Sequence, residues 1–240
     1  MGFTANTKVG EIATANPGAK KVLEAAGVDY CCGGAKPLRD ACMQAGVSEE
    51  EILKRLQENS QQVSPDETNW VAAGLGEITR HIVGKHHKYV RESVPRLRAL
   101  LGKVKAKHGQ NHPELAVIEE RFFDLGQELQ MHMQKEEQIL FPYIEGLERA
   151  ANEKKSPEPP FFGTARNPIH MMMQEHDSAG ELLHEMRKLS AGYQVPKEAC
   201  ESYRELYRSL EEFEGDLHTH IHLENNILFP RTVALEEAAY

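Results

Sequence analysis

The sequence lacks the features of an exported, membrane-spanning or nucleic-acid-binding protein. Its 240 residues contain no apolar run near the roughly 18 residues that cross a bilayer, and the first residues form neither a basic nor an apolar segment. The formal net charge is −9, and no basic patch opposes it, which disfavours general attraction to nucleic acid or anionic lipid. We therefore expect a cytoplasmic protein with no nucleic-acid or membrane partner.

Cysteine and tryptophan are also scarce. The four cysteines are Cys31, Cys32, Cys42 and Cys200, and because two are adjacent they make a poor disulfide framework, which fits a reducing compartment. We expect Cys42 and Cys200 to be ordinary buried thiols on helices. A single Trp and only 18 Gly argue against a β-rich chain, whereas twelve histidines are an excess that needs a chemical explanation.

The first part of the chain resembles a small helical domain, which we assign to residues 1–63. Ser48 followed by Glu51 is a capping-box pattern, and it predicts a helix that ends near Asn59. The polar, proline-containing residues 61–66 predict a linker with a boundary near residue 65. A second domain then covers residues 68–240.

The second domain shows helical periodicity in four long segments, approximately 70–105, 113–148, 167–191 and 196–236. The breaks near residues 108–113 and 192–196 are short, which is typical of antiparallel neighbours. Residues 152–168 carry four prolines and predict an irregular crossover. The pattern predicts an all-α protein, an up-and-down four-helix bundle preceded by the small helical domain.

An internal repeat carries the chemistry of this bundle. HMQKEEQILFP at residues 132–142 aligns with HIHLENNILFP at residues 220–230, with six of eleven positions identical. A His and a Glu four residues apart lie about 40° apart around a helix, so both side chains reach one point in the core. We expect Pro142 and Pro230 to bend or end each helix at the same place.

The duplication extends to a histidine on each preceding helix. His87 and His132 are 45 positions apart, and His176 and His220 are 44 apart. His86 is the fallback for His87, because the two are adjacent. The predicted metal ligands are six side chains: His87, His132, Glu136, His176, His220 and Glu224.

Four imidazoles and two carboxylates without thiolate favour non-haem iron over structural zinc. Six side chains are too many for one metal with an open position. Two octahedral irons, bridged by Glu136, Glu224 and one oxo group, would have about ten of about twelve positions filled. We therefore expect two non-haem iron ions, each with about one position free for water or a diatomic molecule.

The remaining histidines and methionines of these helices have less specific roles. His218 and His222 point away from His220 around the helix and are expected at the surface. His81 and His170 are expected to pack beside the ligands or to support them. Residues 171–173, three methionines, are expected to fill the core and interfaces.

DYCCGG at residues 29–34 is the unusual motif of the small domain. Adjacent cysteines rarely bond to each other, so we expect Cys31 and Cys32 to be exposed thiols in a glycine-loosened turn. Such thiols can take up iron, react with nitric oxide or exchange electrons. A turn with incidental cysteines is the alternative.

Together these motifs resemble the iron–sulfur cluster repair di-iron family, of the YtfE, ScdA, DnrN and NorA type. The resemblance covers nearly the whole chain: DYCCGG marks a ScdA-like N-terminal domain, and the repeat marks a haemerythrin-like bundle. It implies the same six metal ligands. It also implies carboxylates along a route from metal to surface, which would match Glu128 and Glu175 and would act with Cys31 and Cys32 in catalysis.

The resemblance implies a stress-response protein that repairs damaged iron–sulfur proteins and binds or reduces nitric oxide at its di-iron site. The residues do not decide between nitric oxide reductase activity and iron donation. They also do not decide between a monomer and a homodimer. A further alternative is an electron-transfer or iron-storage module that has no substrate of its own. Whether repair activity depends on the cysteine pair would distinguish this alternative from the others.

The competing interpretation is a haemerythrin-like protein that binds or senses oxygen or nitric oxide without catalysis. Ordinary haemerythrins have a fifth histidine four residues after the ligand of the third helix, and this chain has Gly180 there. Their last carboxylate is an aspartate five residues after its histidine, whereas Glu224 follows His220 by four. We therefore expect an iron that is more open than in oxygen carriers.

Overall fold

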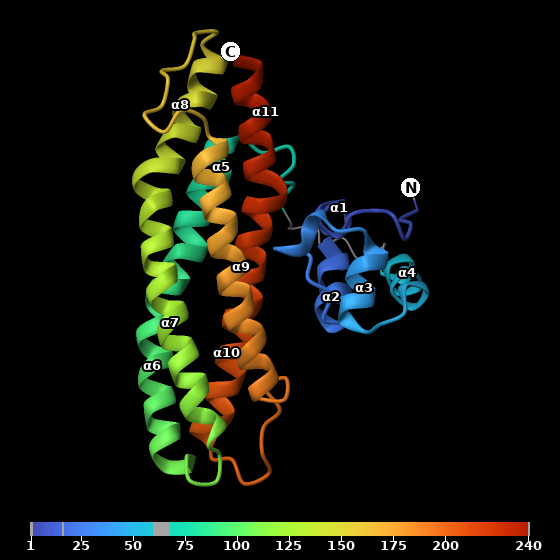
Figure 1. Cartoon of the computed structure of the whole chain (residues 1–240), viewed down its shortest axis with the longest axis vertical. Coiled ribbons are helices and arrows are strands. Elements are labelled where there is room, and N and C mark those ends of the chain that lie inside the picture. Colours follow the sequence, from blue (N-terminus) through green and yellow to red (C-terminus); the bar gives the residue numbers. More distant parts are fainter. Residues whose placement is uncertain (1, 16, 60–67, 240) are drawn as a thin grey trace.

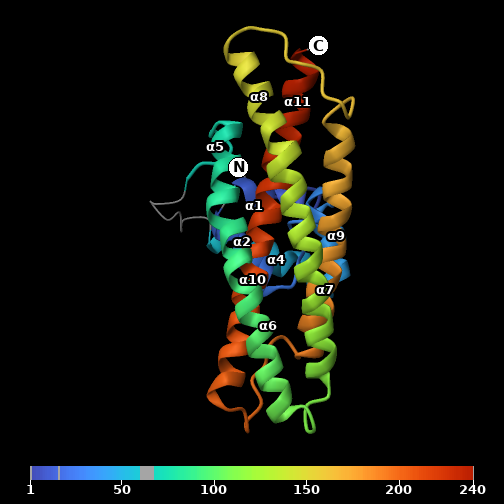
Figure 2. The same cartoon turned by 90° about the vertical axis from the view of Figure 1, so that its left-hand side faces the viewer.

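The computed structural model describes residues 2–15, 17–59 and 68–239. Within these residues the chain forms a long helical bundle and a smaller helical domain that packs against one side of its middle (Figures 1 and 2). The described part contains no β pairing except an isolated bridge between Lys8 and Pro37. The arrangement confirms the predicted all-α fold, an up-and-down four-helix bundle preceded by a small helical domain.

The small domain consists of short helices separated by turns. Its elements are α1 (Val9–Ala15), α2 (Pro17–Ala25), the 3₁₀ turn η1 (Gly33–Ala35), α3 (Leu38–Ala45) and α4 (Glu49–Glu58). The Ser48 side chain accepts from the Glu51 N–H at the start of α4, and Asn59 caps its end, as predicted. The predicted linker at residues 61–66, and with it the domain end at residue 63, falls outside the described residues.

Four long helical segments build the bundle. The first comprises α5 (Leu75–His81), η2 (Ile82–His87) and α6 (Lys88–His108); the second comprises α7 (Glu114–Lys135), η3 (Glu136–Leu140) and α8 (Phe141–Asn152); the third is α9 (Arg166–Leu189); and the fourth comprises α10 (Glu201–Leu223), η4 (Glu224–Leu228) and α11 (Phe229–Ala239). The irregular crossover from α8 to α9 lies at the same end of the bundle as the C-terminus (Figure 1).

Two apolar clusters fill the bundle along its length. One packs residues of α6, α7, α9 and α10, such as Leu97, Phe122 and Phe213. The other packs residues of α5, α8, α9 and α11, such as Ile78 and Ile144. Buried histidines and glutamates lie on the segments that join these clusters. They form a polar layer across the interior, with one apolar cluster on each side of it.

The helices do not end at Pro142 or Pro230, so of the two predicted outcomes, a bend or an end, the second is excluded. Each helix instead widens into a π-helical segment just before its proline and then continues as α8 or α11. A proline has no N–H, and its ring clashes with the carbonyl four residues earlier. The wider turn leaves room for the ring, and the N–H of Phe141 bonds to the carbonyl five residues earlier, that of Glu136. Both π segments begin at a predicted metal ligand.

No helix in the described ranges is both long enough and apolar enough to traverse a lipid bilayer.

Candidate metal centre

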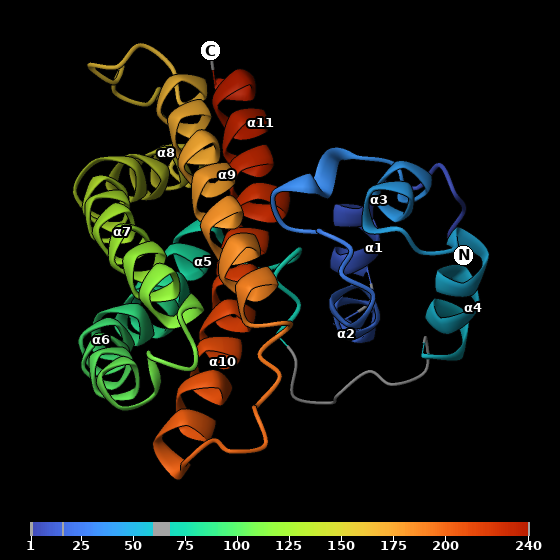
Figure 3. The ribbon, with the colours of Figure 1, turned by 60° about the horizontal axis from the view of Figure 1, so that its bottom comes forward.

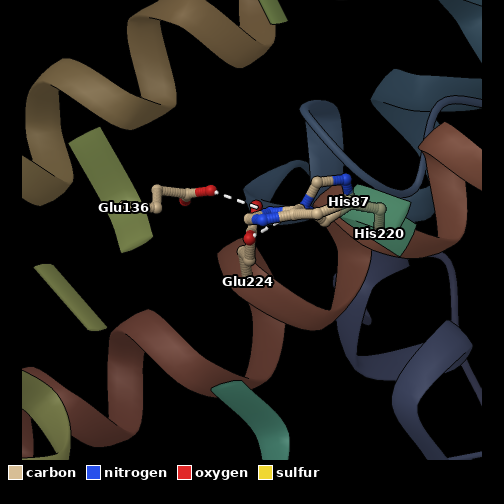
Figure 4. Close-up of side chains that lie close together, drawn as sticks. All are labelled: His87, Glu136, His220 and Glu224. Atoms are coloured by element: carbon tan, nitrogen blue, oxygen red, sulfur yellow. Dashed lines mark hydrogen bonds and ion pairs between the residues drawn. The ribbon is translucent and has the colours of Figure 1, made fainter. Parts of the chain in front are cut away.

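The six predicted ligands come from all four long segments and meet in the polar layer. They form two groups, His87–Glu136–His220–Glu224 and His132–Glu136–His176–Glu224, in each of which one donor atom per residue lies within 4.8 Å of the others. Figure 4 shows the first group, with its side chains pointing toward one another. Both carboxylates belong to both groups, so each can bridge two metal positions.

The distances within the two groups are short. Glu136 Oε2 is 3.3 Å from Nε2 of both His87 and His132. Glu224 Oε1 is 2.9 Å from His220 Nε2, and its Oε2 is 3.1 Å from His176 Nε2. All six residues are at most 2% exposed. The donor atoms of these residues therefore converge in a nearly solvent-free space.

Several of these potential ligand atoms have no hydrogen-bond partner. A bound metal ion would supply the missing partner. The unpartnered atoms include His87 Nε2, both carboxylate oxygens of Glu136, and Glu224 Oε2. Buried polar atoms without partners cost free energy unless something binds them. The residues present thus fit a centre of mixed imidazole and carboxylate donors, the set that suits iron.

A second observation concerns two imidazoles that face each other. His132 Nε2 and His176 Nε2 are 3.1 Å apart, while the Nδ1 atom of each ring lies 2.9 Å from an oxygen of Glu175 or Asn225. If each Nδ1–H donates to its oxygen, each neutral ring directs a lone pair at the other. Such a contact needs a cation between the rings, either a proton or a metal ion.

The electrostatics of these side chains agree with this interpretation. Burial favours the neutral form of Glu224, but the His220 and His176 imidazoles outweigh it and hold the pKa of Glu224 well below its usual range. Burial likewise favours neutral His132, but Glu136 and Glu175 outweigh it and raise the pKa of His132 to about 10. The carboxylates therefore remain ionised and hold cations close to them.

Three of the four imidazoles are oriented through Nδ1 by a neighbouring oxygen. Glu137 Oε1 lies 2.6 Å from His87 Nδ1, and Asn225 Oδ1 lies 2.9 Å from His176 Nδ1. Glu137 and Asn225 each directly follow a glutamate that both groups share, so these two supporting residues occupy equivalent positions of the repeat. Glu175 supports His132 in the same way and is half-buried. Partners of this kind fix the tautomer and direction of a metal-binding ring.

The structure also separates His87 from the adjacent fallback residue, His86. His87 points at Glu136, whereas His86 lies with Nδ1 3.0 Å from Asp216 and stacks on the His220 ring with centroids 5.5 Å apart. His86 belongs to neither donor group. Although His86 is buried, its ring serves to pack against His220.

Glu128 does not reach the centre. Its side chain is exposed and accepts a hydrogen bond of 2.9 Å from Ser178 on α9. Glu175 differs, because it contacts both His132 and Lys135. Of the two carboxylates implied for a route to the surface, only Glu175 touches a donor residue.

The small domain covers the face of α10 that carries His218 and His222. The prediction that His222 is a surface residue was wrong: it is 1% exposed, and its ring meets Tyr30 with centroids 5.4 Å apart. His218 is partly buried, with its ring 6.5 Å from that of Tyr30. Figure 3 shows the small domain against this side of the bundle.

The cysteine pair lies at the same contact, so its predicted exposure was also wrong. Cys31 is 5% exposed and packs into the apolar cluster of the bundle, while Cys32 is half-buried. Cys32 Sγ lies 3.4 Å from the carbonyl oxygen of His176 and donates to it. The turn that holds both thiols therefore reaches the backbone of a predicted ligand.

Asp29 fixes the shape of this turn. Its carboxylate accepts the backbone N–H groups of Cys31 and Cys32, both at 3.0 Å, and of Gly33 at 2.7 Å. The hydrogen bond with Cys32 and then burial raise the pKa of the Cys31 thiol well above its ordinary value. Both thiols are free, with their sulfur atoms 3.9 Å apart.

Two asparagines of η4 connect the bundle to the turn, and neither was predicted from the sequence. Asn225 Nδ2 donates to the Cys31 carbonyl at 3.3 Å, while the Oδ1 of the same side chain faces His176. Asn226 Nδ2 donates to the Tyr30 carbonyl at 3.1 Å. A Cβ at Gly34 would overlap the Asn226 side chain, so this glycine permits the close approach. The sequence signal was the repeat itself, which pairs Asn225 with Glu137.

Gly180 also lies under the small domain. A Cβ at this position would lie 3.5 Å from Cys32 Sγ. The place where ordinary haemerythrins carry a fifth histidine is therefore approached by a thiol of the other domain.

Several other sequence predictions are confirmed only in part. His170 is exposed and supports no ligand, whereas His81 packs on Trp70 with ring centroids 4.2 Å apart. Among residues 171–173 only Met172 is buried, because three successive residues of a helix cannot share one face. Cys42 is a buried helical thiol, but Cys200 precedes α10, is half-buried and lies 3.2 Å from an imidazole nitrogen of His108.

Comparison with known proteins agrees with the two parts of this architecture. Residues 79–232 match the Hemerythrin HHE cation binding domain, and residues 5–60 match ScdA_N, a domain of unknown function. A probable iron-sulfur cluster repair protein of Haemophilus influenzae is 36% identical over 230 residues, which cover 95% of this chain and 97% of the relative.

Iron-sulfur cluster repair protein YtfE of Citrobacter koseri is 36% identical over 229 residues, and that of Salmonella paratyphi B is 35% identical over the same length. Each match covers 95% of this chain and 97% of the relative. The chain therefore belongs to the family of iron–sulfur cluster repair proteins in which a ScdA-type domain precedes a haemerythrin-like bundle, as its motifs predicted.

Proposed function

We propose that this protein holds two iron ions and uses them in the repair of iron–sulfur clusters damaged by nitrosative or oxidative stress. The proposed ligands are His87, His132, Glu136, His176, His220 and Glu224. The observation that carries the proposal is the pair of buried donor groups that share both glutamates. A shared carboxylate is the natural bridge between two metal ions.

The residues around the proposed ligands orient the imidazole rings and exclude water from the centre. Glu137, Glu175 and Asn225 orient three imidazoles through Nδ1. The two apolar clusters exclude water on both sides of the polar layer. When bound, two ferrous ions would supply one electron each and open positions for a small ligand such as nitric oxide or oxygen.

Repair is favoured over reversible oxygen carriage by two features. The relatives described above are named iron–sulfur cluster repair proteins, and they match nearly the whole chain. Gly180 supplies no fifth imidazole, and a thiol approaches this position. All four cysteines are free, which fits the cytoplasm as the compartment that we propose.

The first experiment tests the centre and the repair activity together. The reduced protein should take up two iron ions per chain and restore activity to an iron–sulfur enzyme that nitric oxide has inactivated. Glu136→Gln should lower the iron content and the repair activity, because one bridging charge is lost. Glu120→Gln, which changes an exposed carboxylate of the same helix, should lower neither. Full repair activity by an iron-free Glu136→Gln protein would contradict the proposal.

A second experiment separates nitric oxide reduction from binding. Reduction of two nitric oxide molecules to nitrous oxide and water requires two electrons and two protons. Anaerobic nitric oxide consumption by the reduced, iron-loaded protein is measured with nitrous oxide as the readout. Turnover with a supplied electron donor indicates a reductase, and uptake without nitrous oxide indicates a binder or an iron donor. A stable, fully reversible oxygen complex would instead favour the oxygen-binding alternative.

A further inference from the structure

A second group of potential metal ligands lies outside the six-residue centre. One atom each of Asp29, Cys31 and Cys32 lies within 4.8 Å of the others. Cys31 Sγ is 3.2 Å from Asp29 Oδ1 and 3.9 Å from Cys32 Sγ. These two thiols are free, and a disulfide would require a separation of about 2.05 Å.

The separation of the sulfur atoms matches that of two thiolates on one metal ion. Metal–thiolate bonds are about 2.3 Å long, and at a tetrahedral angle two such bonds place the sulfur atoms about 3.8 Å apart. The turn is already fixed in this shape, because three backbone N–H groups hold Asp29. A Cβ at Gly33 would lie 2.9 Å from Asp29 Oδ2, so the glycine lets the carboxylate approach.

We propose that Asp29, Cys31 and Cys32 form a second metal site, which binds one thiophilic divalent cation such as Fe²⁺ or Zn²⁺. The protein supplies one carboxylate oxygen and two sulfur atoms. A fourth tetrahedral position stays open to water or to an acceptor ligand. Binding replaces water ligands of the hydrated ion by two metal–sulfur bonds and one metal–oxygen bond, releases the two thiol protons and the displaced water to solvent, and transfers no electrons.

The position of this site in the fold suits a role in the entry of iron into the six-residue centre or its exit from it. Cys32 Sγ contacts the carbonyl oxygen of His176, and Asn225 joins the His176 ring to the Cys31 carbonyl. The second site is therefore directly connected to one residue of the six-residue centre. A site with an open position beside that centre suits an ion that is entering or leaving; this role, though not the site itself, rests on the proposed function.

The site is tested with Co²⁺, a divalent ion whose thiolate complexes absorb strongly in the near ultraviolet. Co²⁺ is added anaerobically to the reduced full-length protein after its bundle has been loaded with iron. We expect one Co²⁺ per chain with a thiolate-to-cobalt absorption, and two sulfur neighbours in the cobalt X-ray absorption spectrum. Cys31→Ser and Cys32→Ser should each abolish the two-sulfur signature, and Asp29→Asn should weaken binding at least tenfold.

Cys42→Ser is the matched control, because it removes a buried thiol of the same domain, and it should leave the cobalt signal unchanged. Cobalt bound only by nitrogen and oxygen, or a sulfur signature that survives both Cys31→Ser and Cys32→Ser, would overturn the proposal. The X-ray spectrum of the unmodified protein decides the matter even if a variant misfolds. Iron content is measured in parallel, so failure of the bundle to hold iron is distinguished from failure of the thiol site.

Discussion

Asn226→Ala should release the small domain from the bundle while leaving both parts folded. The side chain donates to the carbonyl of Tyr30 and lies 3.1 Å from His222 Nδ1. Tyr30 and His222 are each 1% exposed, so after truncation their polar atoms stay buried unless the domain moves away. The variant therefore removes a contact that only the docked arrangement uses.

The magnitude follows from these contacts. One neutral hydrogen bond contributes about 1 kcal/mol, and each buried polar group left without a partner costs roughly 1–3 kcal/mol. A docking free energy weakened by about 2–4 kcal/mol corresponds to a roughly 30-fold to 1,000-fold larger undocked population. Gly34→Ala should act in the same direction, since its Cβ would overlap the Asn226 side chain.

The assay is the rate at which a bulky disulfide reagent labels Cys31 in the folded protein. Cys31 is buried against the bundle, so labelling should accelerate by about the same factor as undocking. Cys42, inside the small domain, is an internal control and should keep its slow rate. Asn111→Ala, at the distant turn between α6 and α7, is the matched substitution. An unchanged Cys31 rate, or equal acceleration at Cys42, would refute the docking role.

Three further predictions concern other parts of the bundle. Glu175→Ala, which removes the support of His132 Nδ1, should weaken iron retention roughly 10- to 100-fold in competition with a chelator; equal retention would contradict this. Burial and then His86 lower the pKa of His81 to about 4, below its ordinary 6.5. As pH falls from about 6.5 to 4, His81 therefore becomes protonated in the unfolded chain before it does so in the folded chain, and this favours unfolding. Over this range the urea midpoint should fall more for the natural chain than for His81→Gln. Tyr193→Phe should lower the free energy of unfolding by about 1–3 kcal/mol in urea titration, because it removes the buried 2.6 Å hydrogen bond to Glu214; no change would mean that this bond stabilises nothing.

The sequence was most informative where a local spacing determines geometry. His132 and Glu136, one helical turn apart, must share a face whatever surrounds them, and the repeat requires the same of His220 and Glu224. The four helical segments followed from periodicity in the same way, although the fourth begins at Glu201 and not at the predicted residue 196, so the connection before it is longer than predicted. The π-helical widening could not be predicted as easily, because a proline can end, bend or widen a helix depending on how strongly packing holds the chain beyond it.

The contact between the small domain and the bundle could not be predicted from helical periodicity. Periodicity gives the angle of His222 around its helix but not what lies opposite that face. The angle was correct, since His222 does point away from the centre, and yet the residue is buried because Tyr30 packs on it. Cys31 was misjudged for the same reason, as its turn contacts the bundle.

The two halves of the repeat nevertheless record where the small domain binds. The exposed Gln138 of the first half corresponds to Asn226 of the second, which holds the small domain. The identical positions of the repeat thus include the donor pair of His and Glu, whereas three positions where the halves differ, His222, Asn225 and Asn226, contact the small domain.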